Sequence, residues 1–354
     1  MSKNSSASMN FRRASPVPFL YFVPSVRSEA FLLIFVLLPH IFLLAFTKSF
    51  ASLNLIAVSI FASVLADFFD GEKMIRDPFF WTSSIFRGLV SALFLPSLYP
   101  PTMAFFVVFA AMFLNRAVLG GFANSWANPV AIAVAVAWLL GFGYFPENPI
   151  SQKILSMKNP SLSLINDGTI PLLSSDARIT AFLNEKIFSH LGVSIPAGYI
   201  SLLWDSSSPI PAFRFNVLTL FASAVIFSVG TAGKIVPVVS TVVYVFFARF
   251  VLPLFVGESF GTGDILLAIF TGGFLFGTTF LLQWHGTVPL TKRGKVCYGF
   301  LAGLLEAAFL GFGMSAVGFI FVILILNVFS PLIQAVENRF GNFYGAENVS
   351  SRSV

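Results

Sequence analysis

Charged residues are scarce in this chain. Of its 354 residues only 10% are Asp, Glu, Lys or Arg, whereas 56% are hydrophobic and the mean hydropathy is +0.87. Soluble domains carry about a quarter charged residues, which coat their surfaces. Too few polar side chains remain here to coat a soluble body, so the composition indicates an integral membrane protein.

Cysteine is almost absent as well. Cys297 is the only one, and a single cysteine excludes an internal disulfide, an iron–sulfur cluster and a cysteine zinc site. The three histidines, His40, His190 and His285, lie in separate segments, so we expect no haem or metal site. The net charge of +6 reflects cations gathered on one side of a membrane rather than nucleic-acid binding.

The hydrophobic residues that are present come in long blocks. Each block approaches the ~20 residues that a helix needs to cross a ~30 Å hydrocarbon core. Membrane barrel strands would alternate polar and apolar residues instead. We therefore expect an all-α integral membrane protein with about ten transmembrane helices. The expected spans are 30–47, 51–69, 84–98, 102–119, 129–145, 214–231, 234–256, 263–282, 295–313 and 315–333.

Residues 146–213 interrupt this pattern. They are rich in Pro, Ser and Asn, with only a weakly amphipathic piece near 176–192, which predicts a loop outside the membrane. Five spans on each side predict two five-helix halves, and an odd number of spans inverts the second half. The expected parts are an N-terminal tail (1–28), a first half (29–145), an extracytoplasmic loop (146–213), a second half (214–335) and a C-terminal tail (336–354).

The basic residues set the expected orientation. With the N-terminus in the cytoplasm, nearly all Lys and Arg of the short loops lie inside, and the outer short loops hold only Lys48. The outer loop 257–264 is then acidic. Residues 1–28 lack the features of a cleaved signal peptide. We therefore expect both termini in the cytoplasm. The basic loop 290–295 would anchor anionic lipid headgroups.

Two ionisable residues, Glu306 and Arg249, fall inside predicted spans. Charges within a membrane are costly and are usually paired or functional. Their depths differ by ~8 Å along the helices, which long side chains partly bridge. Three interpretations remain open. The first is that Glu306 takes part in cation transfer. The second is that the two residues form a structural ion pair, and the third is that Arg249 extends outward to the membrane surface.

Five segments follow the pattern of one family. They are Gly88–Pro96; Arg116–Gly121 with Asn128-Pro129; Gly263–Gly277; Pro289–Lys295 with the helix after it; and Asn327 with Pro331-Leu332-Ile333. In this order they resemble the D subunit of Rnf electron-transport complexes and its relative, the B subunit of the sodium-pumping NADH:quinone oxidoreductase. The fourth segment is the most specific. The short N-terminus favours the Rnf branch.

The resemblance implies a flavin mononucleotide (FMN), bound through its phosphate to a threonine in a motif like D-G-x-[ST]-G-A-T-P-L. This chain reads Asp167-Gly168-Thr169-Ile170-Pro171-Leu172, which keeps both ends of the motif but shortens its middle. Ile170 precedes the proline, and Thr169 stands one place early. Either Thr169 carries FMN after a local shift, or the linkage is lost; riboflavin is an alternative cofactor.

The same resemblance extends to the polar stretch 115–129. Arg116 and Asn128 join Thr169, Asp167 and Gly168 as expected cofactor-binding residues. One interpretation is a re-entrant segment near an ion or flavin path. The other is an ordinary loop in which Asn128 caps the helix that begins at Pro129.

The function implied is that of one membrane component of a translocase rather than a complete enzyme, with no catalytic residue of its own. Rnf complexes couple electron transfer between ferredoxin and NAD to the pumping of sodium ions or protons. The partners would be subunits that carry iron–sulfur clusters, flavin and NAD sites, in a bacterial inner membrane. The alternatives are a stand-alone small-solute transporter or channel, and a flavin-free structural subunit of the same complex.

Overall fold

The structure is a computed structural model, and it describes residues 26–69, 80–120, 125–147, 152–157, 159–192, 194–230 and 232–350. The described residues form helices and turns, and no β-strand occurs among them. The prediction of an all-α membrane protein is thereby confirmed. The N-terminal tail 1–25 lies outside the described residues.

The helices of the first half follow the expected spans closely. Proline at the first helical position starts both α5 and α7, because its fixed φ suits a helix and its missing N–H is not needed there. The helices are α1 (Val26–Phe46), α2 (Phe50–Phe68), α4 (Phe80–Leu93), α5 (Pro101–Ala117) and α7 (Pro129–Leu140).

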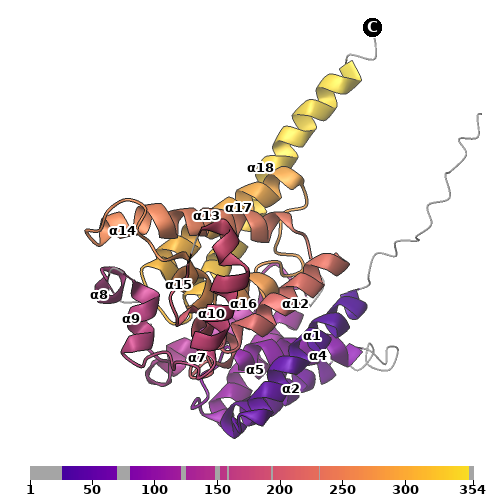
Figure 1. Cartoon of the computed structure of the whole chain (residues 1–354). Coiled ribbons are helices and arrows are strands. Elements are labelled where there is room, and N and C mark those ends of the chain that lie inside the picture. Colours follow the sequence, from indigo (N-terminus) through magenta and orange to yellow (C-terminus); the bar gives the residue numbers. More distant parts are fainter. Residues whose placement is uncertain are drawn as a thin grey trace, which may run out of the picture.

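The second half contains two π-helical turns within its long helices. One joins α13 to α14, and the other follows α17; such turns are frequent at functional sites. The elements are α12 (Asn216–Val229), α13 (Ile235–Phe246), the π-turn Phe247–Val251, α14 (Leu252–Phe255), α15 (Ile265–Phe270), α16 (Phe274–Phe280), α17 (Lys292–Glu306), the π-turn Ala307–Gly311 and α18 (Gly318–Ser350). Figure 1 shows α18 extending beyond the rest of the bundle.

The protein crosses the membrane several times. Five helical stretches among the described residues are long and apolar enough to span a bilayer. The helices α5, α7 and α12 are apolar but shorter, at 17, 12 and 14 residues. The count of ten crossings therefore stays a prediction. The five long stretches are Ser28–Phe46, Phe50–Phe68, Ile235–Phe255, Lys292–Gly311 and Gly318–Arg339.

The span expected over 263–282 is broken, which corrects the prediction of one continuous helix. It forms α15 and α16, separated by Thr271, Gly272 and Gly273. Gly272 and Gly273 have φ of +66° and +75°, where only glycine is unstrained. A Cβ on Gly273 would also lie 2.1 Å from the Phe213 ring. Glycine is therefore required at this break for both conformation and space.

The segment 146–213 folds into short helices. The predicted piece near 176–192 appears as α10 (Asp176–Lys186) followed by a 3-10 turn (Phe188–Leu191). Its other helices are α8 (Gln152–Leu155), α9 (Pro160–Asn166), α11 (Tyr199–Leu203) and the 3-10 turn Pro211–Phe213. Such short elements bury few side chains each, so they leave no clear hydrophobic period in the sequence.

The helix pairing repeats in the two halves. The second helix of each half packs on the fourth (α2 on α5, α13 on α17), and the fourth packs on the fifth (α5 on α7, α17 on α18). Between the halves, α1 contacts α12 and α7 contacts α18, so each contact joins equivalent helices. This pattern is what a two-fold relation between two five-helix halves would produce.

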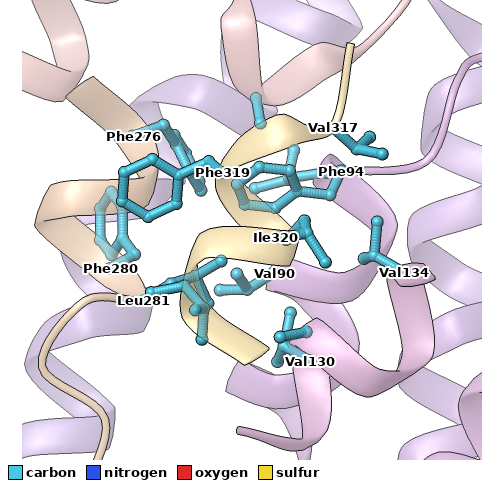
Figure 2. Close-up of a cluster of buried hydrophobic side chains, with 14 of the residues drawn as sticks. Val90, Phe94, Val130, Val134, Phe276, Phe280, Leu281, Val317, Phe319 and Ile320 are labelled. Atoms are coloured by element: carbon cyan, nitrogen blue, oxygen red, sulfur yellow. The ribbon is translucent and has the colours of Figure 1, made fainter. Parts of the chain in front are cut away.

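The hydrophobic core lies where the halves meet. Figure 2 shows side chains from four helices converging: Val90 of α4 and Phe94 directly after it, Val134 of α7, Phe276 of α16 and Ile320 of α18. All five are buried. The core therefore joins the two halves and fixes the helix ends that surround the cavity described next.

Candidate functional site

A cavity of about 300 Å³ lies between the segment 146–213 and the helices of the second half. This volume is at the lower end of the ~300–1,000 Å³ that is usual for ligand sites. Thr169 and Ile170 line it, as do Phe213, Phe270 and the glycine-containing break between α15 and α16. Irregular backbone at such a position is tolerated where it lines a cavity.

The Asp167-Gly168-Thr169 turn presents Thr169 to this cavity. The Thr169 backbone N–H donates to the Asp167 carboxylate at 2.9 Å, which closes a tight turn. Gly168 has φ of +81°, so this position favours glycine. Hydrogen bonds from the Thr169 backbone and hydroxyl lower the pKa of Asp167 below its ordinary value. The Asp-Gly pair therefore has a local structural purpose, which is to shape the turn that exposes Thr169.

Ile170 has a different environment from its neighbour. It is buried in a small cluster with Leu164, Ile165, Leu202 and Leu267, whereas Thr169 is exposed. A side chain packed in this way fixes the turn to the helices beneath it. The hydroxyl one place early in the motif is consequently the one that reaches the cavity.

The break between α15 and α16 leaves backbone carbonyls that need donors. Asn216, at the start of α12, supplies one: its Nδ2 donates to Phe270 O at 2.9 Å and to Leu202 O at 3.2 Å. Asn216 is itself buried. This side chain ties the cavity wall to the segment that carries Thr169.

Arg214 holds the far wall of the cavity, and sequence reasoning missed it. Its Nε donates to Ser208 O at 2.6 Å, and its Nη atoms donate to Ser49 Oγ at 2.9 Å and Ser97 Oγ at 3.2 Å. Its backbone carbonyl lies 2.9 Å from His40 Nε2. The only signal in the sequence was an isolated arginine next to a span, which gives no hint of its three partners from distant segments, His40, Ser49 and Ser97.

The cavity carries more negative than positive side chains. Glu147 and Asp205 line it, together with the hydroxyls of Ser207 and Ser208, and no Lys or Arg is among the described residues that line it. Phe213 and Phe270 supply aromatic surface. The site thus combines flat apolar walls with hydroxyl and carboxylate groups at its edge.

Arg116 and Asn128 lie at the other end of the bundle. Arg116 is in the last turn of α5, ~22 Å along the helix from its start, and it donates to Asp67 O at 2.6 Å. Asn128 accepts from Val130 N at 3.0 Å and so caps α7. The structure therefore does not bring these two residues to the Thr169 cavity. The cap that one interpretation expected of Asn128 is therefore present, and whether the stretch 115–129 is an ordinary loop or a re-entrant segment stays a prediction.

Glu306 and Arg249 are not an ion pair. Glu306 Oε2 accepts from Ser240 Oγ at 2.6 Å, and Arg249 Nη1 donates to Gly263 O at 2.7 Å. The interpretation of a structural pair is therefore wrong. Glu306 is fully buried, whereas Arg249 is only partly buried.

Comparison with known proteins gives consistent relatives over most of the chain. The chain is 23% identical over 339 residues to the D subunit of the ion-translocating oxidoreductase complex of Actinobacillus succinogenes, covering 85% of this chain and 89% of that protein. The protein of the same name from Methanosarcina acetivorans is 25% identical over 329 residues (90% and 93%). The D subunit of the proton-translocating ferredoxin:NAD(+) oxidoreductase complex of Clostridium ljungdahlii is 23% identical over 304 residues (80% and 81%).

A family-level comparison covers still more of the sequence. Residues 14–341 match the NQR2, RnfD, RnfE family. This range contains the five segments that resemble the family and all ten expected spans. The chain belongs to the NQR2, RnfD, RnfE family.

Proposed function

We propose that this protein is the D-type membrane component of an Rnf-type electron-transport complex, and that it carries FMN on Thr169. The names of its relatives describe subunits of ion-translocating oxidoreductase complexes. One observation carries the flavin assignment. Thr169, the hydroxyl side chain that survives in the shortened motif, is exposed and lines the cavity. Ile170, at the expected threonine position, also borders the cavity, but it is buried in a core cluster and has no hydroxyl.

The residues around Thr169 fit such a group. The Thr169 hydroxyl would hold the phosphate by an ester bond. Phe213 and Phe270 offer surfaces against which a flat ring packs. FMN, when bound, would supply the electron-carrying chemistry. The protein's own part is to fix the attachment point through the Asp167–Gly168 turn and to enclose the ring between the segment 146–213 and the helix break.

The test is the intact mass of the purified, denatured chain, with in-gel ultraviolet fluorescence, in wild type, Thr169→Ala and Ser207→Ala. The protein is made in a flavin-sufficient host together with its maturation enzyme. We expect a mass excess of one FMN in wild type, loss of at least nine-tenths of it in Thr169→Ala, and no change in Ser207→Ala. Ser207 is the matched control because it is a neighbouring hydroxyl that lines the same cavity.

Other outcomes have definite meanings. An excess that survives in Thr169→Ala but disappears in Ser207→Ala would move the attachment within the cavity and keep the redox role. The absence of any excess in wild type would contradict covalent FMN. It would leave a flavin-free structural subunit of the complex, or one that binds riboflavin without a covalent bond.

The chain also needs partners for this function. With one cysteine it cannot hold the iron–sulfur clusters that ferredoxin-linked electron transfer requires, so other subunits must supply these and the NAD site. We expect affinity-tagged protein from the native membrane to co-purify with subunits that contain iron and flavin.

A stand-alone transporter is the second candidate, favoured by the two carboxylates and the absence of a cationic side chain among the cavity's described lining residues. Such a site would suit a cationic solute. Solute uptake by vesicles that contain this chain alone, with no co-purifying redox subunit, would support the transporter and contradict the proposed function.

A further inference from the structure

Glu306 is a carboxyl group buried in the bundle with one oxygen free. It ends α17, directly before the π-turn Ala307–Gly311, and its exposed fraction is 0%. Ser240 Oγ donates to Oε2 at 2.6 Å, whereas Oε1 has no hydrogen-bond partner. An ionised carboxylate with an unsatisfied oxygen is strongly unfavourable in an apolar interior. Some ligand must therefore offset its charge.

The position of Glu306 is fixed by the close contact of α13 and α17. Gly299 and Gly303 of α17 face α13 four residues apart, as in the small-residue motifs of membrane helix pairs. A Cβ on Gly303 would lie 2.7 Å from Ser240 O. Because the backbone of Ser240 presses on Gly303, its hydroxyl is held close to Glu306, which follows Gly303 on α17 by three residues.

Among the described residues, no cationic side chain neutralises this carboxyl group. Arg249, on the π-turn after α13, is engaged with Gly263 O. Lys295 of α17 is eleven residues before Glu306, ~16 Å along the helix. The other titratable side chains buried in this helix pair are two tyrosines, Tyr244 of α13 and Tyr298 of α17 itself.

The remaining neighbour of α17 is α18, and its acidic group lies elsewhere. Glu337 of α18 accepts a hydrogen bond from Thr291, at the opposite end of α17 from Glu306. The cation of α18, Arg339, stands 21 residues after the helix begins at Gly318, ~31 Å along it, so this side supplies no counter-charge within the described part of the chain.

We propose that Glu306 is a proton-binding site within the membrane, which takes up and releases one proton through the small cavity beside Tyr244. A proton needs a single free oxygen, which Oε1 provides. A divalent cation would need about six oxygen ligands, and the described residues contain no group of three acidic, His or Cys side chains that could hold one. The proposal rests on the ion translocation in the proposed function, and it names the residue at which the translocated proton binds.

The small cavity that Tyr244 lines supplies the route for the proton. A cavity of about 30 Å³ is lined by Tyr244, Ala248, Asp264 and Gly311 and reaches Pro160 of the segment 146–213. This volume holds one or two waters at about 15 Å³ each. Tyr244 lines this cavity and Glu306 does not, so in the proposed step the Tyr244 hydroxyl relays the proton. It takes the proton of Oε1 and gives its own proton to a cavity water, which becomes hydronium, and Glu306 is left as the carboxylate; loading reverses these changes. The Tyr244 hydroxyl itself donates to Ala268 O, at 3.3 Å.

The test is infrared difference spectroscopy of the assembled complex in lipid nanodiscs, comparing wild type with Glu306→Gln. We expect a protonated-carboxyl carbonyl band in wild type that is lost in Glu306→Gln, disappears as pH is raised and returns when pH is lowered. Replacing potassium chloride by sodium chloride at constant pH should leave the band unchanged. The FMN mass on Thr169, measured in the same samples, should be equal, so failure of this proposal is distinguishable from failure of the flavin assignment.

Three results would overturn the proposal. The first is no band that depends on Glu306 at any pH, and the second is a band that does not respond to pH. The third is a band removed by sodium, which would make this a sodium site. If Glu306→Gln does not assemble, Ser240→Ala serves instead: loss of its hydrogen bond to Oε2 must shift the carbonyl band, and an unshifted band contradicts the assignment.

The two buried tyrosines provide a matched control for the route. Tyr244 lines the cavity, whereas Tyr298 does not. After a pH jump, Tyr244→Phe should slow the response of the Glu306 band at least several-fold, and Tyr298→Phe should leave it unchanged. Equal effects of the two substitutions would reject the route through this cavity.

Discussion

Asp176 organises the segment that carries the candidate site. Its carboxylate is fully buried and accepts from Gly198 N at 2.6 Å, Ser201 N at 2.7 Å, Ser201 Oγ at 2.6 Å and Thr180 Oγ1 at 3.1 Å. Hydrogen bonds from several donors stabilise the ionised form of a carboxyl group. One side chain thus connects α10 to the start of α11, close to Leu202 in the cavity wall.

We expect Asp176→Asn to lower the free energy of local unfolding of this segment by about 3 kcal/mol. Hydrogen bonds to a charged group are lost, and the amide NH₂ places donors where other donors already point. The measurement is hydrogen exchange of residues 173–203 in the intact protein. Ser189→Ala, an exposed hydroxyl in the same segment, is the control and should be neutral. Unchanged exchange in Asp176→Asn would show that the segment is held by other contacts.

The same carboxylate predicts a pH dependence. Burial raises the pKa of Asp176, but the hydrogen bonds from Ser201, Gly198 and Thr180 outweigh it and hold the pKa below its ordinary value of 3.8. The stabilisation is therefore fully present above the ordinary pKa and is lost as pH falls through the folded-state pKa. Exchange of the segment should accelerate only in this acidic window, and Asp176→Asn should remove that pH dependence.

The candidate site was only partly predictable from single residues. The Asp167-Gly168 pair indicates a turn, because these residue types form such turns by known local hydrogen bonds. That Thr169 faces a cavity while Ile170 is buried follows from packing against α9, α11 and α15, which no local pattern reveals. Arg214 was missed for the same reason: its partners, including Ser49 and Ser97, are far away in the sequence.

At the scale of elements, hydropathy predicted the helices well and their interruptions poorly. The block 263–282 is apolar throughout, so its composition predicts one span. The break arises because Gly272 and Gly273 adopt positive φ and admit the Phe213 ring. Two adjacent glycines signal such a break weakly, since membrane helices also use glycine for close packing. The π-turns that accompany Glu306 and Arg249 have no hydropathy signal at all.

The α13–α17 contact gives a prediction at this scale. A Cβ on Gly303 would lie 2.6 Å from the Val243 Cβ, so Gly303→Ala should force the helices apart and destabilise the protein by about 1–3 kcal/mol. Thermal unfolding in detergent would show this as a lower midpoint. Gly143→Ala, where a Cβ meets nothing within 4 Å, is the control. Equal midpoints for the two variants would contradict the tight contact.

For the whole molecule, the unique Cys297 offers a test of orientation. It is exposed on α17, five residues after the helix begins at Lys292. With both termini in the cytoplasm, a membrane-impermeant maleimide should label Cys297 in inside-out vesicles and not in right-side-out vesicles. In a Cys297→Ser background, Ser259→Cys in the loop before α15 should show the reverse. The opposite pattern would invert the predicted topology.

The sequence allowed the division into two halves to be predicted from the number of spans, but not how the two halves pack together. Five apolar blocks on each side of 146–213 suggested the division, but no repeat is visible residue by residue. The pairing of α1 with α12 and of α7 with α18 depends on the three-dimensional packing of helices far apart in sequence. Those contacts use general apolar side chains, which carry no information about their partners.

The core where the halves meet also sets an order of assembly during synthesis. Val90 of α4 and Val134 of α7 enter the membrane early, yet their packing partner Ile320 belongs to α18, which is synthesised much later (Figure 2). Until then this apolar face of the first half can contact only lipid or a chaperone. A chain that stops before α18 is therefore an unfinished product that the cell's quality control can recognise by this uncovered surface.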